Sequence, residues 1–265
     1  MTMTAVREVE WKFEPVDETA QIPGAGEMGE IGMTLGPPIV IDLLATYYDT
    51  VDLRLLAHKL TLRHRTGGSD AGWHLKIPAG GAARTEVQVA GDAEGGVPAE
   101  LLTLARSRVR RAPLDAVATL ATRRVERTVC RADGTQVASM VDDHVHAHRS
   151  ADDVVSDWHE LEVELVGEAT VDVLGEVAGV LVAFGWQRST SPSKIGKVLG
   201  PPPTQPTTPH RGAMRCMLDH LAAHVDAIAV GDPLVRAGDA DAVHDMRVAA
   251  RRLRSALATF RPFFD

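Results

Sequence analysis

Charged and apolar residues alternate strictly at the beginning of the chain. Glu8, Glu10 and Lys12 are each followed by an apolar residue along positions 8–13. Successive side chains of a β-strand point to opposite faces, so the three charged side chains would share one face and the apolar ones the other. The alternation therefore predicts a strand. Taken alone, it is also typical of any sheet with one buried face and one face in water.

Similar short strands are predicted along the chain as far as about residue 165. Glycine, aspartate or proline residues separate many of them, for example at 66–70 and 132–134. The predicted strands cover residues 6–13, 40–49, 59–65, 72–77, 84–89, 122–130, 136–144 and 159–166. Helical spacing interrupts this series and predicts helices at 98–108, 114–120 and 171–184, and the glycine-rich stretch 24–38 is expected to be a loop.

The charged residues of several predicted strands also share one face. These sets are Arg63 with Arg65, His74 with Lys76, Arg84 with Glu86 and Gln88, and Glu160 with Glu162 and Glu164. A water-facing side would explain any one set, but the separation of acidic from basic strands favours a barrel with a charged interior and helices outside. Carboxylates suit a hard divalent cation such as Mg²⁺ or Mn²⁺. Arginines suit phosphate oxygens, so the pattern indicates a site for a metal–phosphate complex.

Composition narrows the possible classes. The chain has 265 residues, 45% of them hydrophobic and 24% charged, which is typical of a soluble globular protein of one large or two smaller domains. The net charge of −8 argues against general binding of nucleic acid or acidic membranes. The two cysteines, Cys130 and Cys216, form neither a disulfide framework nor a metal motif. No apolar leader or membrane-spanning stretch is evident, so a cytoplasmic location is expected.

In chain order, these segments resemble the CYTH family, the triphosphate tunnel metalloenzymes. The likeness covers residues 5 to about 199. It rests on the Glu8-x-Glu10-x-Lys12 opening and on the segments 47–53, 62–65, 73–78, 84–87, 159–162 and 193–194. The resemblance implies an α+β fold, an antiparallel β-barrel tunnel with flanking helices, that binds a triphosphate with Mg²⁺ or Mn²⁺.

Carried over position by position, the resemblance also implies roles for individual residues. Lys12 would be catalytic, beside the phosphate or the attacking water. Glu164 is left out, because the family motif matches only the two preceding acids. The implied metal ligands or their support are Glu8, Glu10, Asp143, Glu160 and Glu162, and the implied phosphate ligands are Arg63, Arg65, Lys76, Arg124 and Lys194.

Alternation does not settle two of these assignments. Arg123 and Arg124 face opposite ways, as do Asp142 and Asp143; the resemblance aligns Arg124 and favours Asp143. A further set, His144 with the histidines at 146 and 148, shares one strand face and raises the alternative of a zinc site. Since no fourth ligand is evident, we interpret these histidines as solvated surface residues.

The expected reaction is metal-dependent hydrolysis of the terminal phosphate of a triphosphate, most simply inorganic triphosphate. A non-catalytic protein that binds triphosphate or polyphosphate is the alternative from another class. The family also contains adenylyl cyclases and thiamine and RNA triphosphatases. No pocket for a nucleotide base can be recognised in the sequence, and nucleotide substrates stay open.

The last part of the chain carries a second pattern. A proline-rich stretch at 200–209 predicts a linker between a domain of residues 1–199 and a helical segment of residues 210–265. Helical spacing predicts an apolar face of Met246, Ala249, Leu253, Leu257 and Phe260. A neighbouring stripe consists of His244, Arg247, Arg251 and Arg254, which would be either a solvated face or a polyanion-binding surface.

Residues 243–254 resemble the opening motif of CHAD domains, which are helical modules associated with binding inorganic polyphosphate. The resemblance implies that the stripe of His244 and the three arginines binds polyphosphate. About the first two helices of such a module are present. We therefore expect this segment to pack loosely against the barrel or to form a homodimer.

Overall fold

The computed structural model describes residues 3–81, 83–191, 193–203 and 211–264. Within these ranges, ten strands belong to one antiparallel sheet. They are β1 (Met3–Pro15), β2 (Met33–Leu35), β3 (Ile39–Asp49), β4 (Thr61–Thr66), β5 (Gly72–Pro78), β6 (Ala83–Val89), β7 (Asp115–Arg131), β8 (Gln136–Arg149), β9 (Val155–Leu165) and β10 (Trp186–Arg188).

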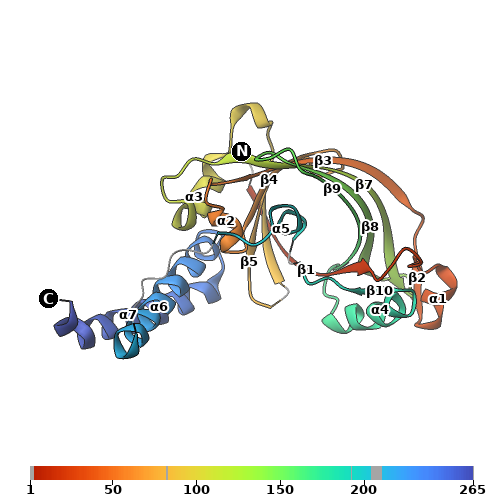
Figure 1. Cartoon of the computed structure of the whole chain (residues 1–265). Helices are drawn as coiled ribbons and strands as arrows, with labels where there is room; N and C mark the ends of the chain where they lie inside the picture. Colours follow the sequence, from red (N-terminus) through yellow and green to blue (C-terminus); the bar gives the residue numbers. More distant parts are fainter. Residues whose placement is uncertain (1–2, 82, 192, 204–210, 265) are drawn as a thin grey trace.

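Eight of these strands close into a barrel, in the order β1-β6-β5-β4-β3-β7-β8-β9. Closure comes from β1, whose first half pairs with β6 and whose second half pairs with β9, with Lys12 opposite Glu162. The short strands β10 and β2 extend the sheet beside β1 and β7. Figure 1 looks into the ring of strands. The expectation of an antiparallel barrel with flanking helices is confirmed.

Most of the helices lie outside this barrel, and α5 lies within it. The helices are α1 (Ala25–Glu30), α2 (Arg54–Ala57), α3 (Ala99–Val109), α4 (Val171–Ala183), α5 (Lys194–Leu199), α6 (Gly212–Arg236) and α7 (Ala240–Phe260), with short 3₁₀ turns η1 (Ala93–Gly95) and η2 (Arg261–Phe263). No helix in the described ranges combines the length and hydropathy that crossing a bilayer requires.

Alternation along each strand sends apolar residues outward to meet these helices. On one side Leu75 and Val87 pack with Leu101 and Leu104 of α3. On the other side, β1, β8 and β9 pack beneath α4, where Phe13 is fully buried. Burial of apolar surface outside the sheet therefore holds the register that turns the alternate, charged residues inward.

One half of the barrel interior is apolar and is filled by α5, which Figure 1 shows within the ring. Ile195 and Val198 of α5 pack against Ala45, Leu120 and Val145, which point inward from β3, β7 and β8. The charged residues of the interior occupy the other half of the barrel, which Lys194, the first residue of α5, also lines. Thus α5 leaves only part of the interior as a cavity.

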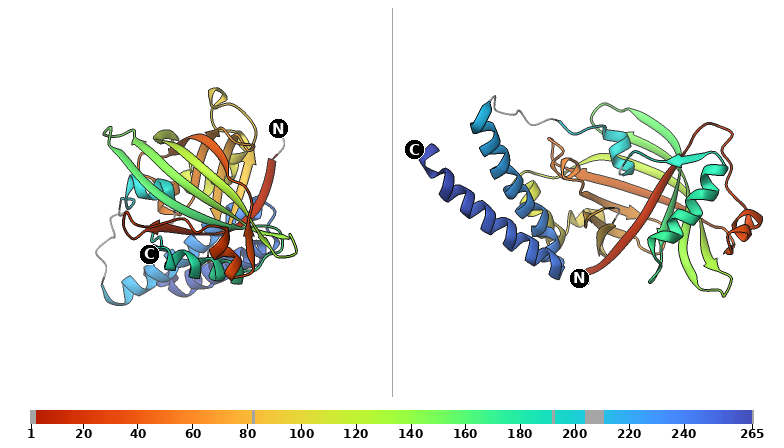
Figure 2. Two further views of the ribbon diagram at one scale, coloured as in Figure 1. Left: turned by 90° about the vertical axis from the view of Figure 1, so that its right-hand side faces the viewer. Right: turned by 90° about the horizontal axis from the view of Figure 1, so that it is seen from below.

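The two C-terminal helices form an antiparallel hairpin. Gly231 allows close approach, because a Cβ there would lie 3.2 Å from the Cβ of Met246. The hairpin contacts the barrel through α3, where Arg108 donates from Nη1 to Oδ1 of Asp226 at 2.9 Å. Both views of Figure 2 show the hairpin beside one part of the barrel. Residues 204–210, and with them most of the proposed linker, lie outside the described residues.

Three local predictions are wrong. Residues 114–120 are not a helix, because this stretch forms the beginning of β7 and pairs with β3 and β8 along its length. The predicted loop 24–38 contains α1 and β2, and β2 pairs with β7. Leu257 is 46% exposed, while Ala242, Ala249 and Ala256 are the buried residues of α7. In each case pairing or packing with distant residues overrides the local pattern.

Candidate functional site

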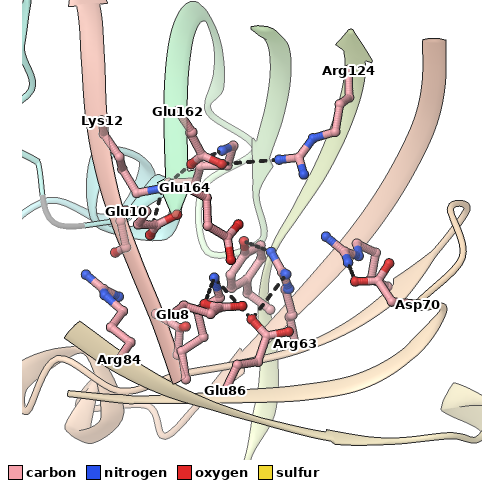
Figure 3. Close-up of a pocket in the computed structure, with 16 residues that line it drawn as sticks. Glu8, Glu10, Lys12, Arg63, Asp70, Arg84, Glu86, Arg124, Glu162 and Glu164 are labelled. Atoms are coloured by element: carbon pink, nitrogen blue, oxygen red, sulfur yellow. Dashed lines mark hydrogen bonds and ion pairs between the residues drawn. The ribbon is translucent and has the colours of Figure 1, made fainter. Parts of the chain in front are cut away.

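A cavity occupies the charged half of the barrel. Seven basic and six acidic side chains line it, so its charges nearly balance. Figure 3 shows them converging from opposite walls. The lining residues are Glu8, Glu10, Lys12, Tyr47, Thr61, Arg63, Arg65, Asp70, Lys76, Arg84, Glu86, Arg124, Glu162, Glu164, Ser193 and Lys194. A near-neutral wall of mixed charges suits a metal–phosphate complex better than a bare polyanion.

The basic wall combines arginines from β4 and β7. Burial, and then repulsion from Arg63 and Arg124, lowers the pKa of Arg65 to about 10. The Nε atoms of Arg63 and Arg65 are buried and have no hydrogen-bond partner among the described residues. Buried donors normally find partners. A bound anion would relieve the repulsion and accept from these donors.

Acidic residues fix some of these cations in place. Lys76 Nζ lies 2.6 Å from Oε2 of Glu8 and 3.1 Å from Oε2 of Glu86. Glu86 also bonds His74, whose other ring nitrogen lies 2.8 Å from the carbonyl oxygen of Asp70. Burial opposes ionisation of Glu86, but Lys76 and His74 outweigh it and hold its pKa well below the ordinary value. Glu86 therefore remains an anion that orients the basic wall.

Lys194 lies at the centre of a carboxylate cluster at the far end of the cavity. Its Nζ is 2.9 Å from Oδ2 of Asp143 and 2.7 Å from Oε1 of both Glu160 and Glu162. The side chain begins α5, where Ser193 Oγ accepts from the backbone of Gly196 at 3.2 Å. Burial disfavours the ammonium ion, but the surrounding carboxylates, Asp143 foremost, raise the pKa of Lys194 well above its ordinary value.

Glu162 connects this cluster with the beginning of the chain. It bonds Lys12, and Arg124 Nη2 donates to its Oε2 at 3.3 Å. Arg124 also donates from Nε and Nη2 to the two oxygens of Asp143, at 2.9 and 2.7 Å. Burial disfavours the ionised form of Glu162. Lys12, Lys194 and Arg124 outweigh this effect and hold the pKa of Glu162 well below its ordinary value.

Two other carboxylates of the cavity, Glu8 and Glu164, are less well compensated by nearby cations than Glu162 is. Burial raises the pKa of Glu8 to about 7, with Lys76 opposing and Glu86 adding to the shift. Burial also raises the pKa of Glu164, which pairs in register with Glu10. A divalent cation among these carboxylates would favour their ionised forms.

The donor set fits a hard divalent cation. Asp143, Glu160 and Glu162 can each present one oxygen with all three oxygens within 4.8 Å of one another. Glu8 and Glu10 add carboxylates across the cavity. Oxygen donors of this kind suit Mg²⁺ and Mn²⁺. In the cluster of three, the Lys194 ammonium group lies where a cation would bind, so it would have to move aside.

The predicted site residues are not all placed alike. Asp143 and Glu160 are buried behind the lining and touch Lys194 instead of the open cavity. Arg123 is exposed, and Asp142 lies outside, bonded to a histidine. The remaining predicted barrel residues line the cavity: Glu8, Glu10, Lys12, Arg63, Arg65, Lys76, Arg124, Glu162 and Lys194.

Sequence reasoning gave no role to several lining residues. Glu86 and Arg84 share a strand face with Gln88, and that alternation was the available signal. Glu164 shares a face with Glu162 and lines the cavity, although the family motif gives it no role. Asp70, which bonds Arg65, lies in a turn, where no periodic signal exists.

On α7, the predicted polyphosphate ligands form an exposed surface, here called the basic stripe: His244, Arg247, Arg251 and Arg254. Its three arginines border one shallow groove. His244 precedes them on the same helix and is exposed. No acidic residue lines that groove among the described residues, unlike the barrel cavity.

The fold is similar to several solved structures. A proposed adenylate cyclase from Bacillus halodurans matches with a TM-score of 0.44 and 18% identity, over 73% of this chain and 99% of that one. Protein PH1819 from Pyrococcus horikoshii matches with a TM-score of 0.44 and 16% identity, over 72% and 98%. A proposed adenylyl cyclase from Hippeastrum, described as having a dominant triphosphatase activity, matches with a TM-score of 0.36 and 14% identity, over 71% and 93%.

Two relatives are more similar in sequence. They are uncharacterized proteins from the CDC 1551 and H37Rv strains of Mycobacterium tuberculosis, each 35% identical over 276 residues. The matches cover 97% of this chain and 53% of each relative. The chain therefore spans about half the length of the curated relatives it matches.

Two family models match successive parts of the chain. The CHAD domain model matches residues 219–265, a range that begins within the first third of α6 and includes α7. The CYTH domain model matches residues 7–178, from the first charged strand to the middle of α4. With this match over most of its length, the chain belongs to the CYTH family of triphosphate tunnel proteins, and a partial CHAD domain follows the barrel.

Proposed function

We propose that the barrel hydrolyses the terminal phosphate of a triphosphate in the presence of Mg²⁺ or Mn²⁺, with inorganic triphosphate as the leading substrate. The supporting observation is the cavity itself, in which buried arginine donors without partners face carboxylates suited to a divalent cation. Phosphoryl transfer requires alignment and charge stabilisation more than covalent help from the protein. This cavity offers both in an enclosed space.

The basic and the acidic residues of the cavity would have different roles. Arg63, Arg65 and Arg124 would bind phosphate oxygens and stabilise the charge that develops on them. Glu8, Glu10 and Glu162 would hold the cation, with Asp143 and Glu160 as neighbouring carboxylates that complete or support this ligand set. When bound, the cation would neutralise phosphate charge and acidify a water molecule.

Lys12 and Lys194 would complete the contacts with the phosphate chain. Lys12 Nζ lies 3.1 Å from Oε1 of Glu10 and also bonds Glu162, so it is held between two acidic residues at the cavity wall. From there it could donate to a phosphate oxygen or orient the attacking water. Lys194 would turn from the carboxylate cluster toward the phosphate when the cation binds.

A binding protein without turnover is the second candidate. It is favoured by the position of Lys194, whose ammonium group already neutralises Asp143, Glu160 and Glu162 without a metal. Affinity measurements do not separate the two candidates, because both predict metal-dependent phosphate binding.

Phosphate release separates them. Inorganic triphosphate, ATP and thiamine triphosphate are each incubated with Mg²⁺ or Mn²⁺, and we expect turnover that is fastest with inorganic triphosphate. Glu10→Gln should abolish it, whereas Glu18→Gln, which changes an exposed acidic residue outside the cavity, should leave it unchanged. Tight metal-dependent binding of triphosphate without phosphate release would establish the second candidate.

We propose further that the hairpin of residues 210–265 supplies a separate polyphosphate-binding surface, its basic stripe, attached to the barrel domain of residues 1–199. The absence of acidic residues along the described groove beside the three arginines supports this role.

A further inference from the structure

The outer surface of the barrel carries a group of metal-binding side chains that is separate from the cavity. Asp142, His144 and His159 can each present one ligand atom with all three atoms within 4.8 Å of one another. None of the three lines the cavity. We propose that these residues bind a transition-metal ion of the Zn²⁺ class on the outside of the barrel.

Strand geometry builds the group. Asp142 and His144 are two residues apart on β8 and therefore share a face, and His159 is the register partner of His144 on β9. The two imidazole rings are stacked, with centroids 4.1 Å apart and an interplanar angle of 14°. Both rings direct Nε2 toward the same oxygen, Oδ1 of Asp142: His159 is bonded to it, and His144 Nε2 lies 3.8 Å away.

Only a small adjustment would form the coordination sphere. Donor atoms at Zn–N distances of about 2.0 Å in a tetrahedral site lie about 3.3 Å from one another. The three ligand atoms are already within 4.8 Å, and the side chain of His144 is 56% exposed, so it can move. His159 is also held by a T-shaped contact with Trp186, with ring centroids 4.9 Å apart. One fixed and one adjustable imidazole can thus close on the ion, and solvent can supply the remaining ligand.

The chemistry of this group differs from that of the cavity. Two imidazoles and one carboxylate favour Zn²⁺, Co²⁺ or Ni²⁺, whereas the all-oxygen set inside favours Mg²⁺ or Mn²⁺. Within the described residues, the other outward histidines of β8 pair with carboxylates and not with a second imidazole: His146 pairs with Asp157 at 2.7 Å, and His148 pairs with Asp153 at 2.9 Å. Among these three histidines of β8, His144 therefore differs from His146 and His148, because His159 of β9 provides a second imidazole beside it.

An ion bound here would also brace the wall of the cavity. Asp142 and His159 are the chain neighbours of Asp143 and Glu160, which point inward and pair in register with each other. Occupancy would therefore tie β8 to β9 directly behind the Lys194 cluster. Binding to the folded state alone would raise the melting temperature.

The test uses Co²⁺ as a spectroscopic probe on the full chain, with millimolar Mg²⁺ present to compete for the all-oxygen ligands. We expect one bound equivalent with visible ligand-field absorption, and a higher melting temperature. His144→Ala and His159→Ala should each weaken binding by roughly tenfold or more. His146→Ala is the matched control, because it removes an exposed histidine of the same strand and face, and its affinity should equal that of the unmodified protein.

Equal affinity in His144→Ala and the unmodified protein would overturn the proposal, as would an equal loss in His146→Ala. Cobalt binding that survives both ligand variants and disappears in Cys216→Ser, the exposed cysteine of α6, would overturn it too. Because His144 is largely exposed, its variant should fold even if His159→Ala loses stability through its contact with Trp186.

Discussion

The barrel cavity and the basic stripe on α7 both offer cations to phosphate, but they do so in opposite ways. In the cavity, buried cations lie among almost as many carboxylates. On α7, exposed arginines border a groove without acidic neighbours in the described structure. The enclosed mixture can discriminate, because an anion must arrive with a metal ion and fit the walls. The open stripe would attract any polyanion, weakly and in a salt-dependent manner.

After the loss expected for Glu10→Gln, the largest effect should come from Glu162, which joins the cations of the cavity. Glu162→Gln removes a charge shared by Lys12, Lys194 and Arg124, and we expect phosphate release to fall by roughly 100-fold or more. Glu164→Gln is the comparison on the same strand face, and its loss should stay within about tenfold, since no cation is within salt-bridge distance of Glu164 in the described structure. Equal losses in Glu162→Gln and Glu164→Gln would mean that only the total charge of the cavity matters, and not the ion pairs of individual residues. Circular dichroism checks that both variants fold.

The sequence predicts the cavity well because both of its signals are local. Alternation places Glu8, Glu10 and Lys12 on one face, and ordered motifs identify the strands that face them. The position of α5 inside the barrel cannot be predicted in this way. Nothing in the segment that begins at Lys194 indicates that it fills the barrel, because its partners Leu120 and Val145 come from strands far along the chain. For the same reason, the local spacing of residues 114–120 predicts a helix, although this stretch pairs on both sides as the beginning of β7.

The second largest effect concerns stability and pH. The pKa of Glu8 is about 7 in the folded protein and 4.5 ordinarily, so between these values the folded state holds a proton that the unfolded state has released. Stability should therefore fall as pH rises from about 4.5 to 7. Glu8→Gln should remove the part of this dependence that is due to Glu8 and, without metal, make the protein more stable at pH 8 by about 3 kcal/mol.

Urea denaturation in EDTA at several pH values measures this difference. Glu18→Gln is the control, because Glu18 is exposed and its removal should leave the pH profile as it is. A profile for Glu8→Gln that parallels the unmodified protein would show that Lys76 fully compensates the Glu8 carboxylate. The cavity would then lack the uncompensated charge that distinguishes a metal site from a set of ion pairs.

A smaller effect tests whether the contact between the barrel and the C-terminal hairpin influences the cavity. Arg108 of α3 is nearly buried and donates to Asp226 of α6, so Arg108→Ala should destabilise the contact between barrel and hairpin by about 1 kcal/mol. Limited proteolysis between the barrel and α6 should become faster, while phosphate release stays unchanged. Slower phosphate release in this variant would mean that the hairpin contributes to the cavity. Arg215→Ala, an exposed arginine of α6 paired within its own helix, is the control.

The smallest effect is expected on the stripe. Arg251→Ala removes one exposed cation, and the loss of long-chain polyphosphate affinity should be only about fivefold, or 1 kcal/mol, because exposed charges are strongly screened. The loss should shrink further as salt is added. Arg252→Ala makes the same change in net charge one position further along α7, off the groove of the stripe, and should weaken binding less. If both variants lose affinity equally, the hairpin acts through its overall charge. If only Arg251→Ala loses affinity, the stripe has a defined geometry and resembles the cavity more closely than its exposure suggests.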